Sequence, residues 1–134
     1  MLHDELFYLM RRLVQEHTAR WQDAGITVTK PQYVVLRALD EHPGLEQTAL
    51  AVAAASTKAT LTEMLTRLEA VGLVERRPDP TDGRRRFVFL TPAGEAQVAD
   101  TRALATSVDD TFLTRLTAPE RVTLRALLLR LERD

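Results

Sequence analysis

Hydrophobic residues recur along the start of this chain at the spacing of an amphipathic α-helix. Within residues 4–22 the apolar positions fall at i, i+3, i+4, i+7 and i+8, and they are occupied by Leu6, Leu9, Met10, Leu13 and Val14. A period of about 3.6 residues places these side chains on one face of a helix and leaves polar side chains on the other. We therefore predict a first helix that ends before Gly25.

Capping signals predict three more helices in the middle of the chain. Thr29 is followed three residues later by Gln32, and this capping box opens a helix with an apolar side. Ser56 and Thr57 offer hydroxyl groups that cap a later helix, and Gly72 stands where a left-handed residue ends it. The predicted segments are residues 29–40, 47–54 and 57–71.

The layout of residues 47–71, a helix, a tight turn and a second helix, is that of a helix-turn-helix, although any helical bundle contains such pairs. A β-hairpin is predicted next, because the β-prone runs 73–77 and 86–90 are separated by turn-forming residues. Four consecutive apolar residues in the second run leave the strand register open. Thr91-Pro92 starts a helix to about residue 114, and the capping box Thr117-Ala118-Pro119-Glu120 opens the last one. The predicted fold class is mainly α with a small β-hairpin.

Composition limits the classes of protein that fit. At 134 residues the chain is expected to form a single domain, and no run approaches the roughly 18 apolar residues of a membrane span. The acidic start Met1-Leu2-His3-Asp4-Glu5 does not resemble a secretory signal. The absence of cysteine excludes disulfides, thiolate chemistry and cysteine-based oxidant sensing. We expect a cytoplasmic protein with no membrane partner.

Positive charge is concentrated in one short segment. The chain has a net charge of −1, yet residues 76–86 hold five arginines against two aspartates, a local balance of +3. The arginines are Arg76, Arg77, Arg84, Arg85 and Arg86, and they surround a loop built from proline, aspartate and glycine. Charge that is segregated in this way points to a binding face more strongly than the total charge does. A solvated charged turn is the alternative interpretation.

A series of motifs follows the predicted helix-turn-helix in a fixed order. They are Leu68-Glu69, Gly72, Arg76-Arg77, Pro78 to Pro80, Asp82-Gly83-Arg84 and Leu90-Thr91-Pro92-Ala93-Gly94. Together with the order of the predicted elements, this series resembles the MarR family of bacterial winged helix-turn-helix regulators. The resemblance covers nearly the whole chain, and the spacing from D-x-R to L-T-x-x-G is specific. It implies a winged helix-turn-helix, here about residues 30–91, with N- and C-terminal dimerisation helices at about 2–24 and 92–133.

The predicted DNA-binding surface combines the second helix of the motif with the hairpin, or wing. Arginines at a hairpin tip suit a narrow minor groove, and we expect the Asp82 carboxylate to hold the Arg84 guanidinium in an extended pose, in agreement with the family resemblance. The N-terminal outer face of the helix suits a major groove, where Glu63 needs a cytosine amine or a neighbouring arginine. For each helix residue alone, an ordinary polar face remains the alternative. The predicted DNA-binding residues are Ser56, Thr57, Lys58, Ala59, Thr60, Thr62, Glu63, Arg67, Arg76, Arg77, Asp82, Arg84, Arg85 and Arg86.

Apolar stripes on the terminal helices predict a homodimer. A monomer would leave part of each stripe exposed, whereas a two-fold axis would bury both and align two recognition helices with successive turns of DNA. Packing of the stripes within one monomer is the alternative. The predicted dimerisation residues are Leu6, Met10, Leu13, Leu124, Leu127, Leu128 and Leu131.

The family resemblance also implies a small aromatic or phenolic effector bound between the winged lobe and the dimer helices. His17, Trp21, Tyr33 and Arg37 are the candidate lining residues, with ordinary packing as the alternative for each. The histidines are not spaced for a shared metal site, and no catalytic constellation is present, so we expect no metal, no cofactor and no enzyme activity.

Three functional hypotheses follow from the sequence. The first and favoured one is a sequence-specific DNA-binding transcriptional regulator that acts as a homodimer. We expect it to be a repressor that binds a pseudo-palindromic operator and that a small ligand releases from the DNA. The second is a winged-helix protein-interaction module without specific DNA binding. The third is a small hydrolase with an unrecognised site.

Overall fold

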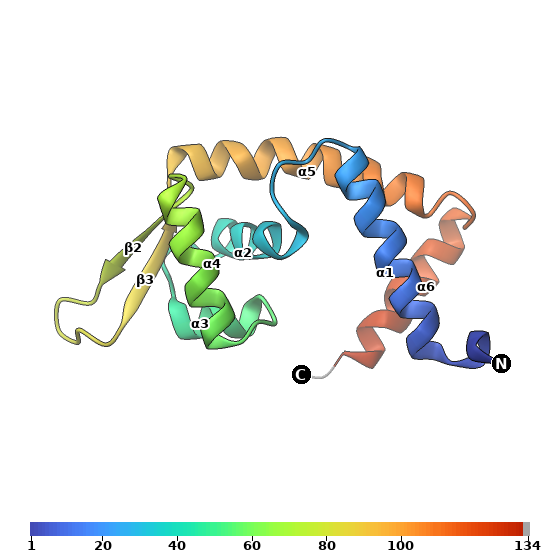
Figure 1. The fold of residues 1–134 in the computed structure, drawn as a ribbon, viewed down its shortest axis with the longest axis horizontal. Coiled ribbons are helices and arrows are strands. Elements are labelled where there is room, and N and C mark those ends of the chain that lie inside the picture. The colour runs from blue at the N-terminus through green and yellow to red at the C-terminus, as the bar shows by residue number, and fades with distance from the viewer. Residues whose placement is uncertain (133–134) are drawn as a thin grey trace. The chain divides into compact units, whose positions relative to one another are not determined.

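A computed structural model describes residues 1–132, which fall into two compact units (Figure 1). The first unit contains residues 1–25 and the chain from residue 105 onward, and the second contains residues 26–104. Residues 92–104, which we expected among the terminal helices, belong to the second unit. Position 133, the predicted end of those helices, lies outside the described residues.

The first unit is helical. A short 3₁₀ turn, η1 (Leu2–Asp4), precedes α1 (Leu6–Asp23), and the C-terminal part of α5 (Pro92–Phe112) leads to α6 (Ala118–Leu131). The first helix begins two residues later than predicted, because Glu5 is extended and serves as its N-cap. The capping box at the start of α6 is confirmed: Thr117 accepts from the Glu120 backbone, and Glu120 accepts from the Thr117 backbone. The hydrogen bond that the Thr117 backbone N–H donates to the carboxylate is the main cause of a lowered pKa of Glu120, and the Thr117 side chain adds to it.

The second unit contains the helix-turn-helix and the wing. Its elements before α5 are α2 (Lys30–Glu41), β1 (Leu45–Glu46), α3 (Gln47–Ala53), α4 (Lys58–Ala70), β2 (Val74–Pro78) and β3 (Arg86–Leu90). The three strands form an antiparallel sheet in the order β1-β3-β2. The two-residue strand β1 was not predicted, because a segment so short has no periodicity and exists only through its pairing with β3.

Buried leucines and valines form the core of the second unit. The predicted stripe of α4 is confirmed, since Leu61, Leu65 and Leu68 are almost completely buried. Val88 fixes the strand register that the sequence left open: it is the fully buried residue of β3 and pairs with Arg76 of β2. Phe87, beside it in the apolar run, stays partly exposed.

The glycine after α4 and the L-T-x-x-G motif join the helix, the wing and α5. Gly72 has a left-handed φ of +80°, which lets the backbone N–H of Leu73 bond the carbonyl of Leu68 at 2.9 Å. The Thr91 hydroxyl donates to the Gly72 carbonyl at 2.5 Å and accepts from the Gly94 N–H at 3.0 Å. A Cβ at Gly94 would overlap the carbonyl oxygen of Leu73, so only glycine permits this close approach.

Within residues 1–132, no helix has both the length and the apolar character needed to cross a membrane.

Candidate nucleic-acid interface

Hydrogen bonds across the turn between α3 and α4 fix the geometry of the helix-turn-helix. Thr57 caps α4 by accepting from the Thr60 backbone N–H at 3.2 Å. Gln47 at the start of α3 donates to the Thr62 hydroxyl at 2.9 Å, and that hydroxyl donates to a carbonyl of its own helix. Thr62, predicted to bind DNA, is therefore engaged inside the motif. No local pattern in the sequence points to Gln47, because its partner lies 15 residues away.

The outer face of α4 is polar and exposed at its N-terminal end, as the helical pattern predicted. The side chains of Lys58, Ala59 and Thr60 are exposed, and Ser56 in the preceding turn is half-buried. The first turn of α4 thus exposes an ammonium group, a methyl group and a hydroxyl group, which suit phosphate, a thymine methyl and a base edge.

Glu63 forms an ion pair with Arg67 one turn further along α4. Glu63 Oε1 lies 3.4 Å from Arg67 Nη2, and both side chains are 72% exposed. Of the two roles considered for this carboxylate, the structure shows the one in which it holds a neighbouring arginine. The pair stands at i, i+4 in water and is therefore weak, so either side chain is free to exchange its partner for DNA.

Two of the five wing arginines are held against the protein by carboxylates near the base of the wing. Arg76 is half-buried and binds Glu69 of α4 twice, through its guanidinium at 2.9 Å and its backbone N–H at 3.0 Å. These two bonds lower the pKa of Glu69. Arg77 pairs with Glu75 at 3.2 Å and lies 4.1 Å from the centre of the Phe89 ring, a cation–π contact.

Two more arginines are held by groups of the wing loop and of β1. Arg85 binds Glu46 of β1 at 3.2 Å and Asp79 at 3.5 Å, and the Glu46 carboxylate raises the pKa of the Arg85 guanidinium. Arg86 donates to the Gly83 carbonyl at 2.7 Å and so closes the loop from within. Four of the five arginines that the sequence assigned to DNA therefore also serve the wing's own structure.

Arg84 differs from the other four. Its side chain is exposed at the tip, and its guanidinium has no hydrogen bond or ion pair within residues 1–132. The predicted contact of Asp82 with this guanidinium is wrong: Asp82 Oδ1 accepts from the Arg84 backbone N–H at 3.0 Å. An aspartate two residues ahead favours this backbone turn, because the amide is within reach without any bending of the long arginine side chain. Asp82 thus shapes the turn, and the Arg84 side chain extends from it.

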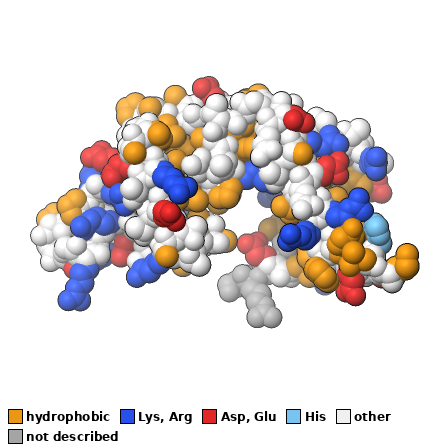
Figure 2. All heavy atoms as spheres, viewed as in Figure 1, with side chains coloured by type: hydrophobic (Ala, Val, Ile, Leu, Met, Phe, Trp, Pro, Cys, Tyr) orange, Lys and Arg blue, Asp and Glu red, His pale blue; other side chains and the backbone are white. Residues whose placement is uncertain are grey.

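The charges on this end of the second unit are mixed. Figure 2 shows Lys and Arg side chains over the wing and the helix-turn-helix, with Asp and Glu side chains among them. The positive field of this surface is therefore weaker than five clustered arginines alone would produce, and among the five wing arginines only Arg84 has neither an ion pair nor a hydrogen bond to its guanidinium in the described chain.

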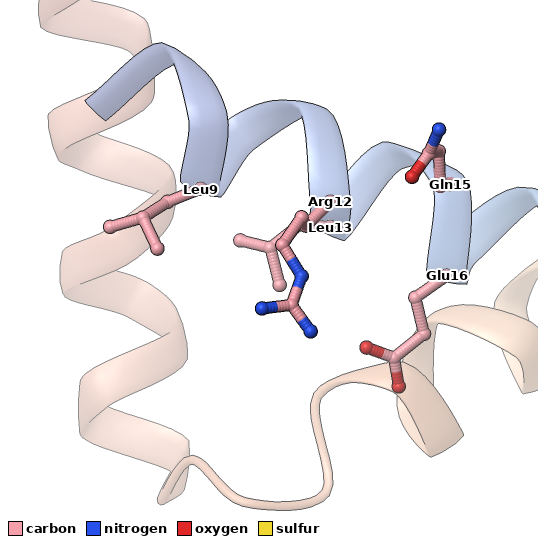
Figure 3. Close-up of a pocket in the computed structure, with 5 residues that line it drawn as sticks. All are labelled: Leu9, Arg12, Leu13, Gln15 and Glu16. Carbon is pink, nitrogen blue, oxygen red and sulfur yellow. The ribbon is translucent and has the colours of Figure 1, made fainter. Parts of the chain in front are cut away.

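The predicted dimerisation residues are all exposed in the first unit. Their exposed fractions range from 36% for Leu124 to 70% for Leu131, and the set is Leu6, Met10, Leu13, Leu124, Leu127, Leu128 and Leu131. Packing within the monomer, the alternative considered above, does not bury them. Figure 3 shows a hollow on α1 in which Leu9 and Leu13 lie beside the charged groups of Arg12 and Glu16. An apolar surface with a charged edge is typical of a protein–protein interface.

The four candidate ligand residues are divided between the two units. In the first, His17 Nε2 lies 2.7 Å from Asp109 Oδ1, and Trp21 is buried. In the second, Tyr33 is half-buried, and the Arg37 guanidinium binds two carboxylates of α2 at 2.9 and 3.2 Å. The ligand cavity formed by these four residues stays a prediction.

Comparison with known proteins identifies the family. The model of the MarR family matches residues 28–85, which form α2, the helix-turn-helix and most of the wing. The chain is 52% identical to the transcriptional regulator HosA of Escherichia coli O111:H- over 120 residues. The aligned residues cover 90% of this chain and 89% of HosA. The chain belongs to the MarR family. The comparisons confirm both sequence-based predictions, membership of the MarR family and a role as a transcriptional regulator.

Solved structures confirm the winged helix-turn-helix fold of this MarR-family protein. The PcaV transcriptional regulator of Streptomyces coelicolor, in complex with its natural ligand, is 32% identical with a TM-score of 0.91, over 98% of this chain and 94% of PcaV. The transcriptional repressor CouR, bound to a 23-mer DNA duplex, is 29% identical with a TM-score of 0.91, over 98% of this chain and 95% of CouR.

Proposed function

We propose that this MarR-family protein is a transcriptional repressor that binds a pseudo-palindromic DNA operator as a homodimer. The observation that carries the proposal is the combination of an exposed polar face on α4 with a wing whose tip arginine has no acidic partner in the described chain. The N-terminal end of α4 enters the major groove, and Arg84 enters the adjacent minor groove, where the phosphates of both strands deepen the negative potential. CouR, a structural relative bound to a 23-mer DNA duplex, supports DNA binding by this chain.

The residues of the interface have different roles in this proposal. Lys58, Thr57 and Ser56 contact phosphates, whereas Thr60 and Ala59 face base edges. Arg67 reaches a phosphate or a guanine while Glu63 limits its freedom. Arg76, Arg77, Arg85 and Arg86 support the wing and add positive charge close to the backbone.

Dimerisation follows from the exposed leucine stripes of α1 and α6. Seven large apolar side chains on two helices form a surface that water disfavours, and a second copy of the chain offers a matching one. A two-fold axis then sets two copies of α4 about 34–36 Å apart, one turn of DNA. The second unit supplies the DNA-binding lobe, and the terminal helices supply the dimer contacts.

Release by a small aromatic or phenolic effector completes the proposed function. PcaV, a structural relative, was solved with its natural ligand, and this supports an effector here. The effector favours those dimers whose recognition helices do not match the operator spacing. A panel of such compounds tests this: those that release DNA are expected to raise the melting temperature of the free protein. The regulator works in the cytoplasm and without catalysis.

Operator selection followed by sequencing is the decisive test. Purified protein is incubated with random duplexes at moderate salt, and bound DNA is amplified and sequenced. We expect two inverted half-sites about ten base pairs apart and affinity that falls steeply with salt. Absent or salt-insensitive binding would contradict the proposal and favour the protein-interaction module.

A further inference from the structure

Arg85 joins the wing to the start of the helix-turn-helix, a segment that is distant in sequence. Its guanidinium binds Glu46 at the end of β1 with Nη2 to Oε2 at 3.2 Å, and Asp79 just beyond β2 with Nη1 to Oδ2 at 3.5 Å. The guanidinium also lies 5.4 Å from the centre of the Phe87 ring. One cation thus connects the start of the helix-turn-helix with both strands of the wing.

Asp79 is fixed by further bonds, so it is a firm partner. Its carboxylate accepts from the Thr81 backbone N–H at 2.9 Å and from the Thr81 hydroxyl at 2.8 Å, and only 11% of its side chain is exposed. The Asp79 backbone N–H donates to the Arg85 carbonyl at 3.1 Å, and the Arg85 backbone N–H donates to the Asp82 carbonyl at 3.1 Å. Arg85 is therefore held by side chain and backbone, while the neighbouring residue Arg84 carries the tip side chain.

The attachment of the wing to the rest of the unit is otherwise slight on this side. Strand β1 has only two residues, and its pairing with β3 consists of Leu45 with Val88 and Glu46 with Phe87. Beyond that point the loop is held mainly by its own turn bonds. Without the contact to Glu46 the loop would lose more entropy when it docks, and such a loss weakens binding by about 0.5–1.5 kcal/mol, or roughly 2- to 13-fold, for each side chain that becomes ordered.

We propose that Glu46 is a positioning residue for DNA binding, which holds Arg85 so that Arg84 is presented to the minor groove. The proposal rests on the proposed function as a DNA-binding regulator. Glu46 touches no DNA in it and acts only through the wing. A purely electrostatic role and a positioning role predict opposite results when Glu46 is neutralised. Loss of a negative charge near DNA would strengthen binding, whereas loss of the contact that holds Arg85 would weaken it.

The test measures the dissociation constant for the selected operator at one moderate salt concentration. Glu46→Gln is expected to bind about 3- to 10-fold more weakly than wild type. Glu46→Asp keeps the charge but shortens the side chain, and it is expected to lose affinity as well. Glu75→Gln is the matched control, because it removes the same charge from a pair confined to one strand, and it is expected to bind as well as wild type or more tightly.

A double-mutant cycle separates positioning from a general loss of structure. In an Arg84→Ala background, Glu46→Gln is expected to change affinity less than about two-fold, because the side chain it positions is gone. An undiminished loss in that background, or wild-type affinity of both Glu46 variants, would overturn the proposal. Failure of the wild-type protein to bind any selected DNA would instead contradict the proposed function itself, so the two failures are distinguishable.

Discussion

Gly72 and Gly94 show two different reasons for glycine at neighbouring points of the same fold. Gly72 has a φ of +80°, and a Cβ added there would meet no atom within 4 Å, so its requirement is purely conformational. Gly94 needs the absence of a side chain for a close contact with the Leu73 carbonyl. The two glycines therefore satisfy two separate requirements, a left-handed backbone at Gly72 and a close backbone contact at Gly94.

Replacement of Gly72 by alanine tests the conformational requirement alone. We expect Gly72→Ala to lower the free energy of unfolding by about 1 kcal/mol, because alanine in the left-handed region is strained. Gly83→Ala is the matched control, since Gly83 also has open space around it but lies outside the left-handed region. Urea unfolding at one protein concentration measures both variants, and equal losses would contradict the explanation.

The ion pair between Glu69 and Arg76 makes stability depend on pH. Because Arg76 lowers the pKa of Glu69 in the folded state, the pair stabilises the fold above the unfolded value of about 4.3. This contribution disappears as the pH falls through the lower, folded pKa. We expect Glu69→Gln to destabilise the protein at pH 7 and to have a smaller effect at pH 3, where less of this contribution remains. Thermal unfolding at the two pH values measures this, and an equal loss at both would show that the charge is irrelevant.

At the scale of the element, the five arginines of the wing have different roles although they are chemically identical. Four arginines have partners within the protein, and one extends from the tip. The positive charge of the segment was evident in the sequence, but its division was not, because the acids that bind Arg76 and Arg85 come from α4 and β1. The wing is therefore better described as one tip arginine, Arg84, on a hairpin that the other four arginines stabilise.

Arg84→Ala tests this description of the wing. We expect it to weaken operator binding by about 1–3 kcal/mol and to leave the melting temperature unchanged. Arg77→Ala removes the same charge from the same wing, and it is expected to cost less affinity, because Arg77 is held by Glu75 and Phe89. Fluorescence anisotropy over a salt series measures both variants. Equal losses would mean that only the total charge of the wing matters.

At the scale of the whole molecule, the exposed leucines of α6 are the residues that we propose hold two copies together. We expect Leu128→Asp to convert the dimer to a monomer and to weaken operator binding by at least ten-fold, since a monomer holds only one half-site. Ala126→Asp places the same charge on the same helix, on the exposed face opposite the stripe, and it is expected to remain dimeric. Light scattering and gel shifts measure the two properties. A monomeric variant that binds as tightly as wild type would contradict the assembly.

The helices and their limits were predictable from the sequence, because helical periodicity and capping are local. The capping boxes at Thr29 and Thr117 and the buried stripe of α4 are confirmed to within a residue or two of their predicted places. Strand β1, the bond from Gln47 to Thr62 and the clamp on Arg85 were not predictable. Each of these joins residues that are far apart in the chain, and no pattern in a single sequence pairs them.

The sequence by itself determined the order of the elements, the apolar faces and the segment in which positive charge gathers. Each of these depends on side chains within a few residues of one another, whose spacing fixes which face of a helix or strand they occupy. Only the tertiary structure decided which wing arginine has no partner for its guanidinium within residues 1–132, and that the terminal leucines stay exposed. The first property depends on which carboxylates and carbonyl groups the folded chain brings within about 3 Å, the distance at which hydrogen bonds form, and the second depends on which distant apolar surfaces it packs together.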